Sequence, residues 1–200
     1  MSVTHVMLPR HEHLLESVVS EVSGTDVVII CHPHPLYGGS MENNVVMALH
    51  ECLFREGLST IRFNFRGVGA STGSYGEGDG ETEDLISVFA HAAKEGDRRV
   101  HLGGYSFGAW VVLNAVKRGL QPVSTILASP PLDFMDFKTL ALPPSPTLIV
   151  LGDSDSFCAV ESLHSWLATQ PPGASPPKLA ILPGCDHFYW GYEDPLGQQV

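Results

Sequence analysis

The sequence has little positive charge, no long apolar run and no paired cysteine motif. Lys and Arg number 11 against 22 Asp and Glu, which gives a formal net charge of −11. An acidic surface repels phosphate backbones and anionic lipids, and no basic cluster interrupts it, so nucleic acid and membrane are not expected as partners. No apolar run reaches the roughly 20 residues that a membrane-spanning helix needs.

Signals for export are missing as well. The N-terminal residues lack the basic start and long apolar stretch of a secretory signal peptide. The four cysteines have no C-x-x-C spacing, and without an export signal they are expected to be free thiols. We therefore expect a soluble cytoplasmic protein. The cysteines are Cys31, Cys52, Cys158 and Cys185.

Internal repeats, low-complexity tracts and domain linkers are also absent from the sequence. Its 200 residues, 44% of them hydrophobic, are enough to bury a substantial core. The proline-rich pieces at 142–146 and 171–177 are short and border apolar runs, so we expect loops there. We predict that residues 1–200 form one domain.

Six short apolar, β-branched runs predict strands that are buried on both faces. They are apolar at consecutive positions and do not alternate, which is typical of parallel strands. Two earlier segments, 3–8 and 14–22, are more typical of antiparallel edge strands. The six runs cover residues 27–31, 59–65, 100–103, 123–128, 147–151 and 178–182.

Four segments between these runs have helical spacing. In the first of them Val46, Leu49 and Leu53 share one face. Strands that alternate with helices predict β-α-β units, and hence a three-layer α/β/α sandwich with a mostly parallel central sheet and no cap domain. In such sheets the chemistry gathers on loops at the carboxyl ends of strands. The helical segments are 43–56, 81–94, 109–118 and 160–168.

The most specific motif is Gly104-Tyr105-Ser106-Phe107-Gly108, which follows an apolar strand and opens a helix. A serine on a tight strand-to-helix turn has a strained backbone, so glycines two positions away avoid clashes. The amides at the start of the following helix then point to where negative charge develops during acyl transfer. The motif predicts Ser106 as a nucleophile.

A serine hydroxyl needs a base that accepts its proton. In this type of site the chain order is serine, then acid, then histidine, and only His164 and His187 follow Ser106. His164 falls inside a predicted helix, where a packing or surface role is expected. His187 lies in the loop after the last predicted strand and is therefore the expected general base.

The acid is expected on the loop after residues 147–151, which offers Asp153 and Asp155. Its task is to hold the imidazole tautomer and to stabilise the imidazolium. We favour Asp155, because Asp153 is nearer the strand and is expected to shape the turn. Asp186 is adjacent to the histidine in the sequence and is expected to point elsewhere.

An oxyanion hole needs two backbone N–H donors. One is expected from Phe107, the residue after the nucleophile. The other is expected from the loop at 32–40, in which two prolines lack an N–H. By position, Leu36 is the first choice and Tyr37 the second.

Two other features of the sequence invite a different chemistry. His32 and His34 form a His-x-His pair, but no HExxH or Asp-His cluster accompanies it, so we expect them to bond neighbouring loops and not a metal. The glycine-rich segment 65–73 lacks the Lys-Ser/Thr of a phosphate-binding loop and the spacing of a dinucleotide fingerprint. We expect it to be a tight crossing beside the nucleophile loop.

Together these motifs resemble the α/β-hydrolase superfamily, and more closely its small, capless, dienelactone-hydrolase-like bacterial serine hydrolases. The resemblance implies a catalytic Ser106, Asp155 and His187. It also implies hydrolysis of a small-molecule carboxylic ester or thioester through an acyl-enzyme, without a cofactor. The matching segments are residues 32–35, 38–39, 43–44, 62–69, 104–108, 152–155 and 186–188.

One departure from that family keeps other interpretations open. Its members usually end in a helix packed on the sheet, whereas residues 188–200 contain Gly191, Pro195 and Gly197, which oppose a long helix. Either the last helix is very short or the sheet is bare there, which leaves open whether the protein is a monomer or a homodimer. The alternative functions are a peptidase or acyltransferase on the same triad, and a non-catalytic binding protein with this fold.

Overall fold

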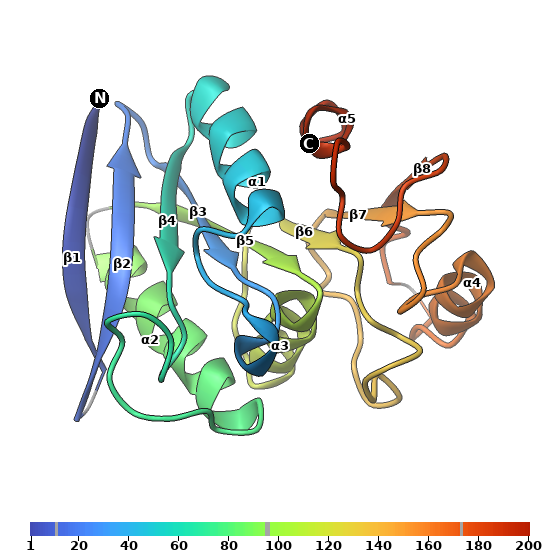
Figure 1. The fold of residues 1–200 in the computed structure, drawn as a ribbon, viewed down its shortest axis with the longest axis horizontal. Helices are drawn as coiled ribbons and strands as arrows, with labels where there is room; N and C mark the ends of the chain where they lie inside the picture. The colour runs from blue at the N-terminus through green and yellow to red at the C-terminus, as the bar shows by residue number, and fades with distance from the viewer. Residues whose placement is uncertain (11, 95–96, 173) are drawn as a thin grey trace.

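An eight-stranded, mostly parallel sheet is the framework of the protein (Figure 1). The computed structural model describes residues 1–10, 12–94, 97–172 and 174–200. The strands lie in the order β1-β2-β4-β3-β5-β6-β7-β8; β2 pairs antiparallel with β1 and β4, and all other neighbours are parallel. The strands are β1 Ser2–Arg10, β2 His13–Glu21, β3 Asp26–Cys31, β4 Ser59–Phe63, β5 Arg99–Tyr105, β6 Thr125–Ala128, β7 Thr147–Gly152 and β8 Lys178–Leu182.

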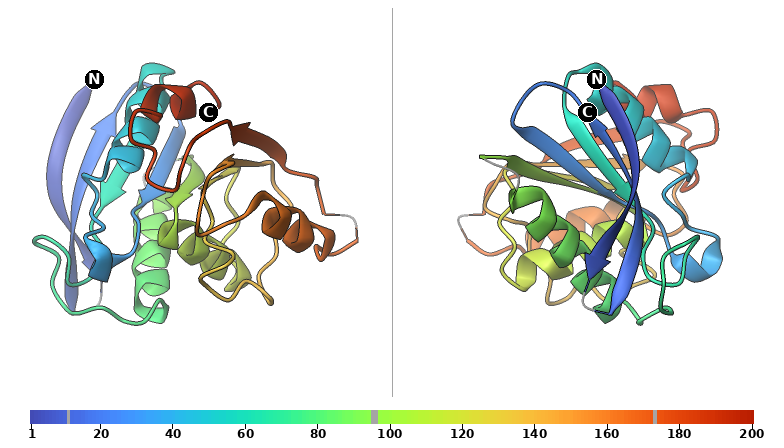
Figure 2. Two further views of the ribbon diagram at one scale, coloured as in Figure 1. Left: turned by 45° about the vertical axis from the view of Figure 1, so that its right-hand side comes forward. Right: turned by 90° about the vertical axis from the view of Figure 1, so that its left-hand side faces the viewer.

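Helices cover both faces of this sheet, as Figures 1 and 2 show. On one face lie α1 and α5, and on the other lie α2, α3 and α4. The predicted fold class is therefore confirmed, and the described residues form no separate cap over the sheet. The helices are α1 Asn44–Arg55, α2 Asp79–Lys94, α3 Phe107–Lys117, α4 Val160–Ala168 and α5 Glu193–Gly197, with a short 3-10 helix, η1, at Pro35–Tyr37.

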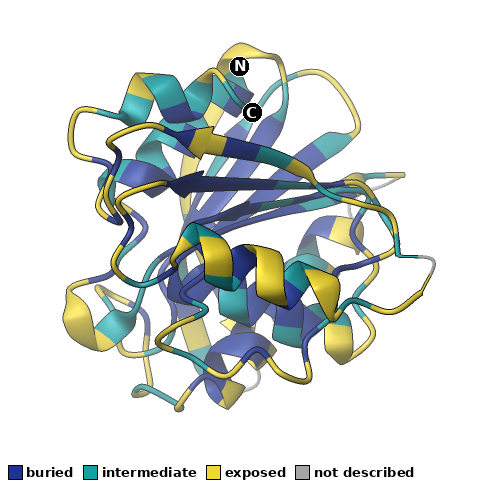
Figure 3. Ribbon diagram, turned by 90° about the vertical axis from the view of Figure 1, so that its right-hand side faces the viewer, coloured by how far each residue is buried: buried dark blue, intermediate teal, exposed yellow. Residues whose placement is uncertain are grey.

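The central strands are apolar at consecutive positions because each face packs against helices. In β3, Val27 and Ile29 belong to the core on the α2–α3–α4 side, whereas Val28 and Ile30 belong to the core on the α1–α5 side. All four side chains are almost fully buried, and Figure 3 shows the same burial along the neighbouring strands. The consecutive apolar runs thus predicted the middle of the sheet correctly.

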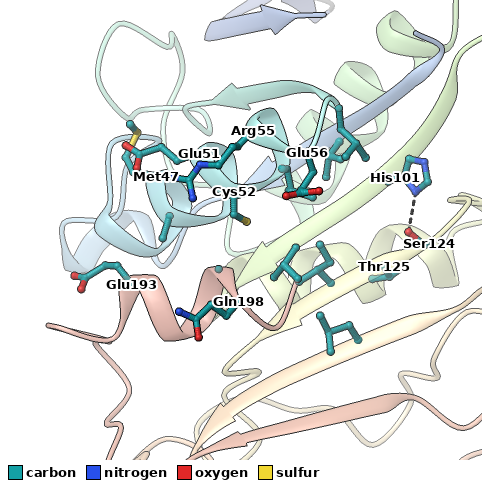
Figure 4. Close-up of a pocket in the computed structure, with 18 of the residues that line it drawn as sticks. Met47, Glu51, Cys52, Arg55, Glu56, His101, Ser124, Thr125, Glu193 and Gln198 are labelled. Carbon is teal, nitrogen blue, oxygen red and sulfur yellow. Dashed lines mark hydrogen bonds between the residues drawn. The ribbon is translucent and has the colours of Figure 1, made fainter.

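The chain ends in a very short helix, which decides between the two outcomes expected for the C-terminal segment. Helix α5 has five residues and packs against α1. Leu196 is fully buried there, and a Cβ on Gly197 would lie 3.2 Å from Cβ of Cys52. An open groove of about 950 Å³ lies between α1, α5 and strands β6 and β7 (Figure 4).

The structure also bears on the cysteines and on membrane-spanning helices. All four cysteines are free thiols, as predicted. Within the described part of the chain, no helix is long and apolar enough to cross a bilayer.

Candidate active site

Ser106 lies at the strained turn between β5 and α3. Its φ of 54° and ψ of −119° place a non-glycine residue in a region that is costly for an L-amino acid. A Cβ on Gly104 would lie 2.5 Å from the carbonyl oxygen of Gly108, and one on Gly108 would lie 2.3 Å from that of Cys31. The two glycines are needed because the turn closes on itself and against β3.

Three predicted residues meet at the carboxyl end of the sheet. Oγ of Ser106 lies 2.9 Å from Nε2 of His187, and Nδ1 of His187 lies 2.9 and 2.8 Å from the two carboxylate oxygens of Asp155. They come from the loops after β5, β8 and β7, and all three are buried. The structure therefore brings together side chains that are up to 81 residues apart in the sequence.

The carboxylate of Asp155 is held facing the imidazole. Its Oδ1 also accepts hydrogen bonds from the backbone N–H groups of Phe157 at 2.8 Å and Cys158 at 3.1 Å. With Nδ1–H of His187 donating to this carboxylate, Nε2 carries the lone pair that can accept the hydroxyl proton of Ser106. The arrangement can activate a serine for attack on an acyl carbon.

The other candidate side chains have structural partners. Oδ1 of Asp153 accepts from the N–H of Gly184 at 2.7 Å, which ties the loop after β7 to the loop after β8. Oδ1 of Asp186 accepts from the N–H of Phe188 at 2.9 Å and closes its own turn. His164 lies exposed on α4.

Two tyrosines that the sequence reasoning missed support the His187 loop. The Tyr105 hydroxyl donates to the carbonyl oxygen of His187 at 2.8 Å. The Tyr189 hydroxyl donates to the carbonyl oxygen of Val150 at 3.2 Å and lies 2.9 Å from Oγ of Ser129. Burial raises the pKa of Tyr105, and the charge of Asp155 adds to this, so the hydroxyl remains a neutral donor. A buried tyrosine hydroxyl usually needs a hydrogen-bond partner, but the sequence alone does not show which group that partner is.

An asparagine at the start of α1 supports the same loop from the opposite side. Nδ2 of Asn44 donates to the carbonyl oxygen of Phe188 at 2.9 Å and to a carboxylate oxygen of Glu193 at 3.0 Å. It therefore joins three parts of the chain: the helix after β3, the His187 loop and α5. The sequence reasoning used Asn44 only as part of the family resemblance.

The structure does not bring Leu36 to the reaction centre as an oxyanion donor. Its N–H donates to Nδ1 of His34 at 3.2 Å, which caps η1, and its side chain points into solvent. The N–H of Tyr37 is also occupied, by the carbonyl oxygen of His34 at 3.1 Å. By contrast, the N–H of Phe107 is the first of helix α3 and has no intrahelical acceptor.

A different residue of that loop has a free amide beside the nucleophile. His34 lines the same cavity as Ser106 and Phe107. Within the described ranges, the backbone N–H of His34 donates no hydrogen bond to the chain. It was not chosen from the sequence, because which amide of the loop is free depends on how η1 folds.

The histidine pair bonds neighbouring loops, as predicted. In His32, Nδ1 lies 2.7 Å from the carbonyl oxygen of Pro33 and Nε2 accepts from the N–H of Phe65 at 3.0 Å, so both ring nitrogens are occupied. Burial lowers the pKa of His32 to about 4, which keeps the ring neutral. Nε2 of His34 lies 3.2 Å from the hydroxyl of Tyr75. Among the described residues, no group of three or more His, Cys, Asp or Glu side chains is placed to hold a metal ion.

The cavity beside Ser106 has a volume of about 340 Å³. It is distinct from the larger groove of Figure 4, which none of the three site residues lines. Because Ser106 lines the smaller cavity, that cavity is the candidate substrate site. Its lining residues are Pro33, His34, Tyr37, Gly38, Gly39, Asn43, Tyr105, Ser106, Phe107, Pro131, Phe134, Met135, Phe157, His187 and Phe188.

Comparison with known proteins agrees with this fold. Residues 28–144 match the model of the alpha/beta hydrolase family. A serine hydrolase homologue from Coxiella burnetii is 34% identical, with a TM-score of 0.90 over 99% of this chain and 95% of that one. A serine hydrolase without a lid from Xanthomonas campestris is 32% identical, with a TM-score of 0.89 over 98% of this chain and 90% of that one.

A relative identified by sequence similarity supports the same family. An uncharacterized protein of Rickettsia prowazekii is 32% identical over 82% of this chain and 71% of its own length. The chain belongs to the alpha/beta hydrolase family. Within that family it is similar to a serine hydrolase homologue and to a serine hydrolase without a lid.

Proposed function

We propose that the protein is a serine hydrolase that cleaves small carboxylic esters or thioesters through an acyl-enzyme. The observation that carries the proposal is the 2.9 Å contact between Oγ of Ser106 and Nε2 of His187, made at a strained turn that opens into a cavity. Hydrogen-bond distance between nucleophile and base, with the base oriented by a third group, is the geometry that nucleophilic catalysis requires.

In the first half of the reaction, Oγ of Ser106 attacks the acyl carbon while Nε2 of His187 takes the hydroxyl proton. Asp155 stabilises the imidazolium that forms. The N–H groups of Phe107 and His34 are the proposed donors to the oxyanion, and the amino end of α3 adds its dipole. Collapse of the tetrahedral intermediate breaks the bond to the leaving alcohol or thiol, which receives the proton from Nε2.

In the second half, water repeats these steps on the acyl-enzyme. His187 takes a proton from water as the oxygen attacks the acyl carbon, and the second tetrahedral intermediate forms in the same oxyanion site. Its collapse breaks the bond to Oγ of Ser106, which recovers its proton from Nε2. The products are a carboxylic acid and the unchanged enzyme.

The test uses Ser106→Ala with short 4-nitrophenyl esters and a fluorophosphonate probe. We expect turnover to fall to the background rate and labelling to disappear, because the attacking oxygen is gone. The matched control is Ser156→Ala, which removes an exposed hydroxyl one residue beyond Asp155; it should keep both readouts. Undiminished turnover or labelling in Ser106→Ala would refute the proposal.

A further inference from the structure

Among the residues that the structure describes, none that lines the cavity beside Ser106 has a permanently charged side chain. None of its lining residues is Lys, Arg, Asp or Glu. Burial lowers the pKa of His34, which keeps that ring neutral as well. A substrate group in this cavity therefore meets aromatic rings, a methionine, prolines and the polar atoms of the reaction centre.

Aromatic rings also continue from the cavity to its mouth. The ring centroids of Tyr37 and Phe134 are 6.5 Å apart, those of Phe134 and Phe157 are 5.5 Å apart, and those of Phe157 and Phe188 are 6.3 Å apart. Phe157 lies 4.5 Å from the ring of His187. We call these four residues, Tyr37, Phe134, Phe157 and Phe188, the aromatic collar.

Three of the four collar side chains are exposed to water, which is energetically unfavourable for apolar rings unless a ligand covers them. Tyr37, Phe134 and Phe188 have exposed fractions of 74, 56 and 50%. They come from three different connections of the chain and line the same cavity as Ser106. Exposed apolar side chains gathered at the mouth of a concave site are typical of a surface that binds an apolar ligand.

A charged substrate group would bind poorly at such a place. A carboxylate or phosphate that enters the cavity loses water and gains no cation in return, which is strongly unfavourable. The net charge of −11 opposes its approach as well. The volume of about 340 Å³ lies near the lower end of the range for ligand cavities, so the bound group is small.

We infer that the site selects uncharged, apolar acyl esters and discriminates against acyl groups that carry a carboxylate or phosphate. The aromatic collar makes this selection because its side chains offer an anion no cation, and Phe134 is the specificity-determining position at which an added cation should reverse it. The inference rests on the proposed function and specifies its substrate class.

The test compares two esters that differ only in charge. One is the 4-nitrophenyl ester of adipic acid, whose acyl chain ends in a carboxylate; the other is that of adipamic acid, whose chain ends in a neutral amide of the same shape. After correction for spontaneous hydrolysis, we expect the wild-type kcat/KM to be tenfold to a hundredfold higher for the amide. Equal values for the two esters would overturn the inference while leaving the proposed function intact.

A pair of variants tests whether the collar causes the selection. Phe134→Lys adds a cation at an exposed collar position, and Phe134→Gln removes the ring without adding charge. We expect the lysine variant alone to raise the carboxylate-to-amide ratio of kcat/KM by tenfold or more. An unchanged ratio in that variant would overturn the role of Phe134.

The outcomes separate the two proposals. If wild-type protein hydrolyses neither ester, and the fluorophosphonate probe labels wild type and Ser106→Ala alike, the proposed function itself is wrong. If labelling depends on Ser106 and only the charge preference is missing, the error lies in the substrate class.

Discussion

Asp84 and Asp155 are both buried carboxylates, yet their surroundings differ in kind. Asp84 accepts from Nη2 of Arg66 at 2.6 Å and from the N–H of the same residue at 3.0 Å, and Nε of Arg10 lies 3.6 Å away. Its partners keep their charge at all ordinary pH values. Asp155 faces the imidazole of His187, which can gain and lose a proton beside a hydroxyl.

The position of each carboxylate completes the contrast. Asp84 lies on α2 at its contact with β1 and lines neither of the two cavities described above. Asp155 lies on a loop at the carboxyl end of the sheet. It does not line the cavity itself but is hydrogen-bonded to His187, which does. A buried carboxylate thus serves the fold when its partners have fixed charge, and can serve chemistry when its partner is an imidazole that can accept a proton from a neighbouring nucleophile.

The largest effect is expected from Asp155→Asn. The amide can turn an N–H₂ towards Nδ1 of His187 and favour the wrong imidazole tautomer, so kcat should fall by a factor on the order of 10⁴. The free energy of unfolding should change little, since the amide oxygen can still accept from Phe157 and Cys158. Initial rates and urea unfolding measure the two effects; a loss of kcat below tenfold would contradict the assignment.

Asp84→Asn should lower the free energy of unfolding and leave kcat almost unchanged, which is the opposite of Asp155→Asn. It removes the fully buried charge partner of the Arg66 and Arg10 guanidinium groups and leaves them only the half-exposed Glu83, which should lower the free energy of unfolding by about 3–5 kcal/mol. Activity per folded molecule should stay close to that of wild type. The matched control is Glu83→Gln, a half-exposed carboxylate that pairs with the same two arginines, for which we expect about 1 kcal/mol or less. If urea unfolding gave the same loss of free energy of unfolding for both variants, the burial of Asp84 would not explain its contribution to stability.

His32 is a buried group that is hydrogen-bonded to neither Asp84 nor Asp155, and its protonation should affect the pH dependence of stability. Its pKa is about 4 in the folded protein and about 6.5 in an unfolded chain, because burial disfavours the charged ring. Between these values the unfolded state binds more protons, so the free energy of unfolding rises with pH. This contribution, roughly 3 kcal/mol, is fully present above pH 6.5 and is lost as pH falls to 4.

The measurement is urea unfolding of wild type and His32→Asn at several pH values between 4 and 7.5. The variant should be less stable at pH 7 and should show a shallower rise of stability with pH across that window. Parallel pH profiles for the two proteins would contradict the role given to His32.

The smallest effect is expected from Tyr105→Phe. It leaves the carbonyl oxygen of His187 buried without its donor, which should cost about 1–3 kcal/mol of stability. A loosened imidazole should lower kcat by about tenfold or less while KM stays the same, because the aromatic ring of residue 105, which lines the cavity, is retained in phenylalanine. Tyr192→Phe is the matched control, since its hydroxyl serves an exposed carbonyl of Pro183 that water can reach. A kcat loss in the control as large as in Tyr105→Phe would contradict a specific role for Tyr105.

The strands and helices could be predicted from the sequence because their signals are local. Consecutive apolar residues marked β3 to β8, and helical spacing marked α1 to α4, with boundaries that differ from the structure by only a few residues. The Gly-x-Ser-x-Gly motif located Ser106 because the strained turn itself demands those glycines. Chain order then pointed to Asp155 and His187.

The second oxyanion donor could not be predicted in the same way. Leu36 and Tyr37 stand at suitable positions in the sequence, but the capping of η1 by His34 occupies both of their amides. Whether a backbone N–H is free depends on the fold of the loop around it, and a loop with two prolines allows several arrangements.

By itself the sequence determined the class of fold and pointed to the three side chains that meet in the candidate site, since residue spacing and backbone strain are properties of short segments. Only the tertiary structure decided which hydroxyl supports the His187 backbone, that the amides of Leu36 and Tyr37 are occupied, and that four rings from separate loops line the cavity. These features depend on the distance and direction between segments far apart in the chain. Packing of the whole sheet and its helices sets those distances, and no local pattern carries them.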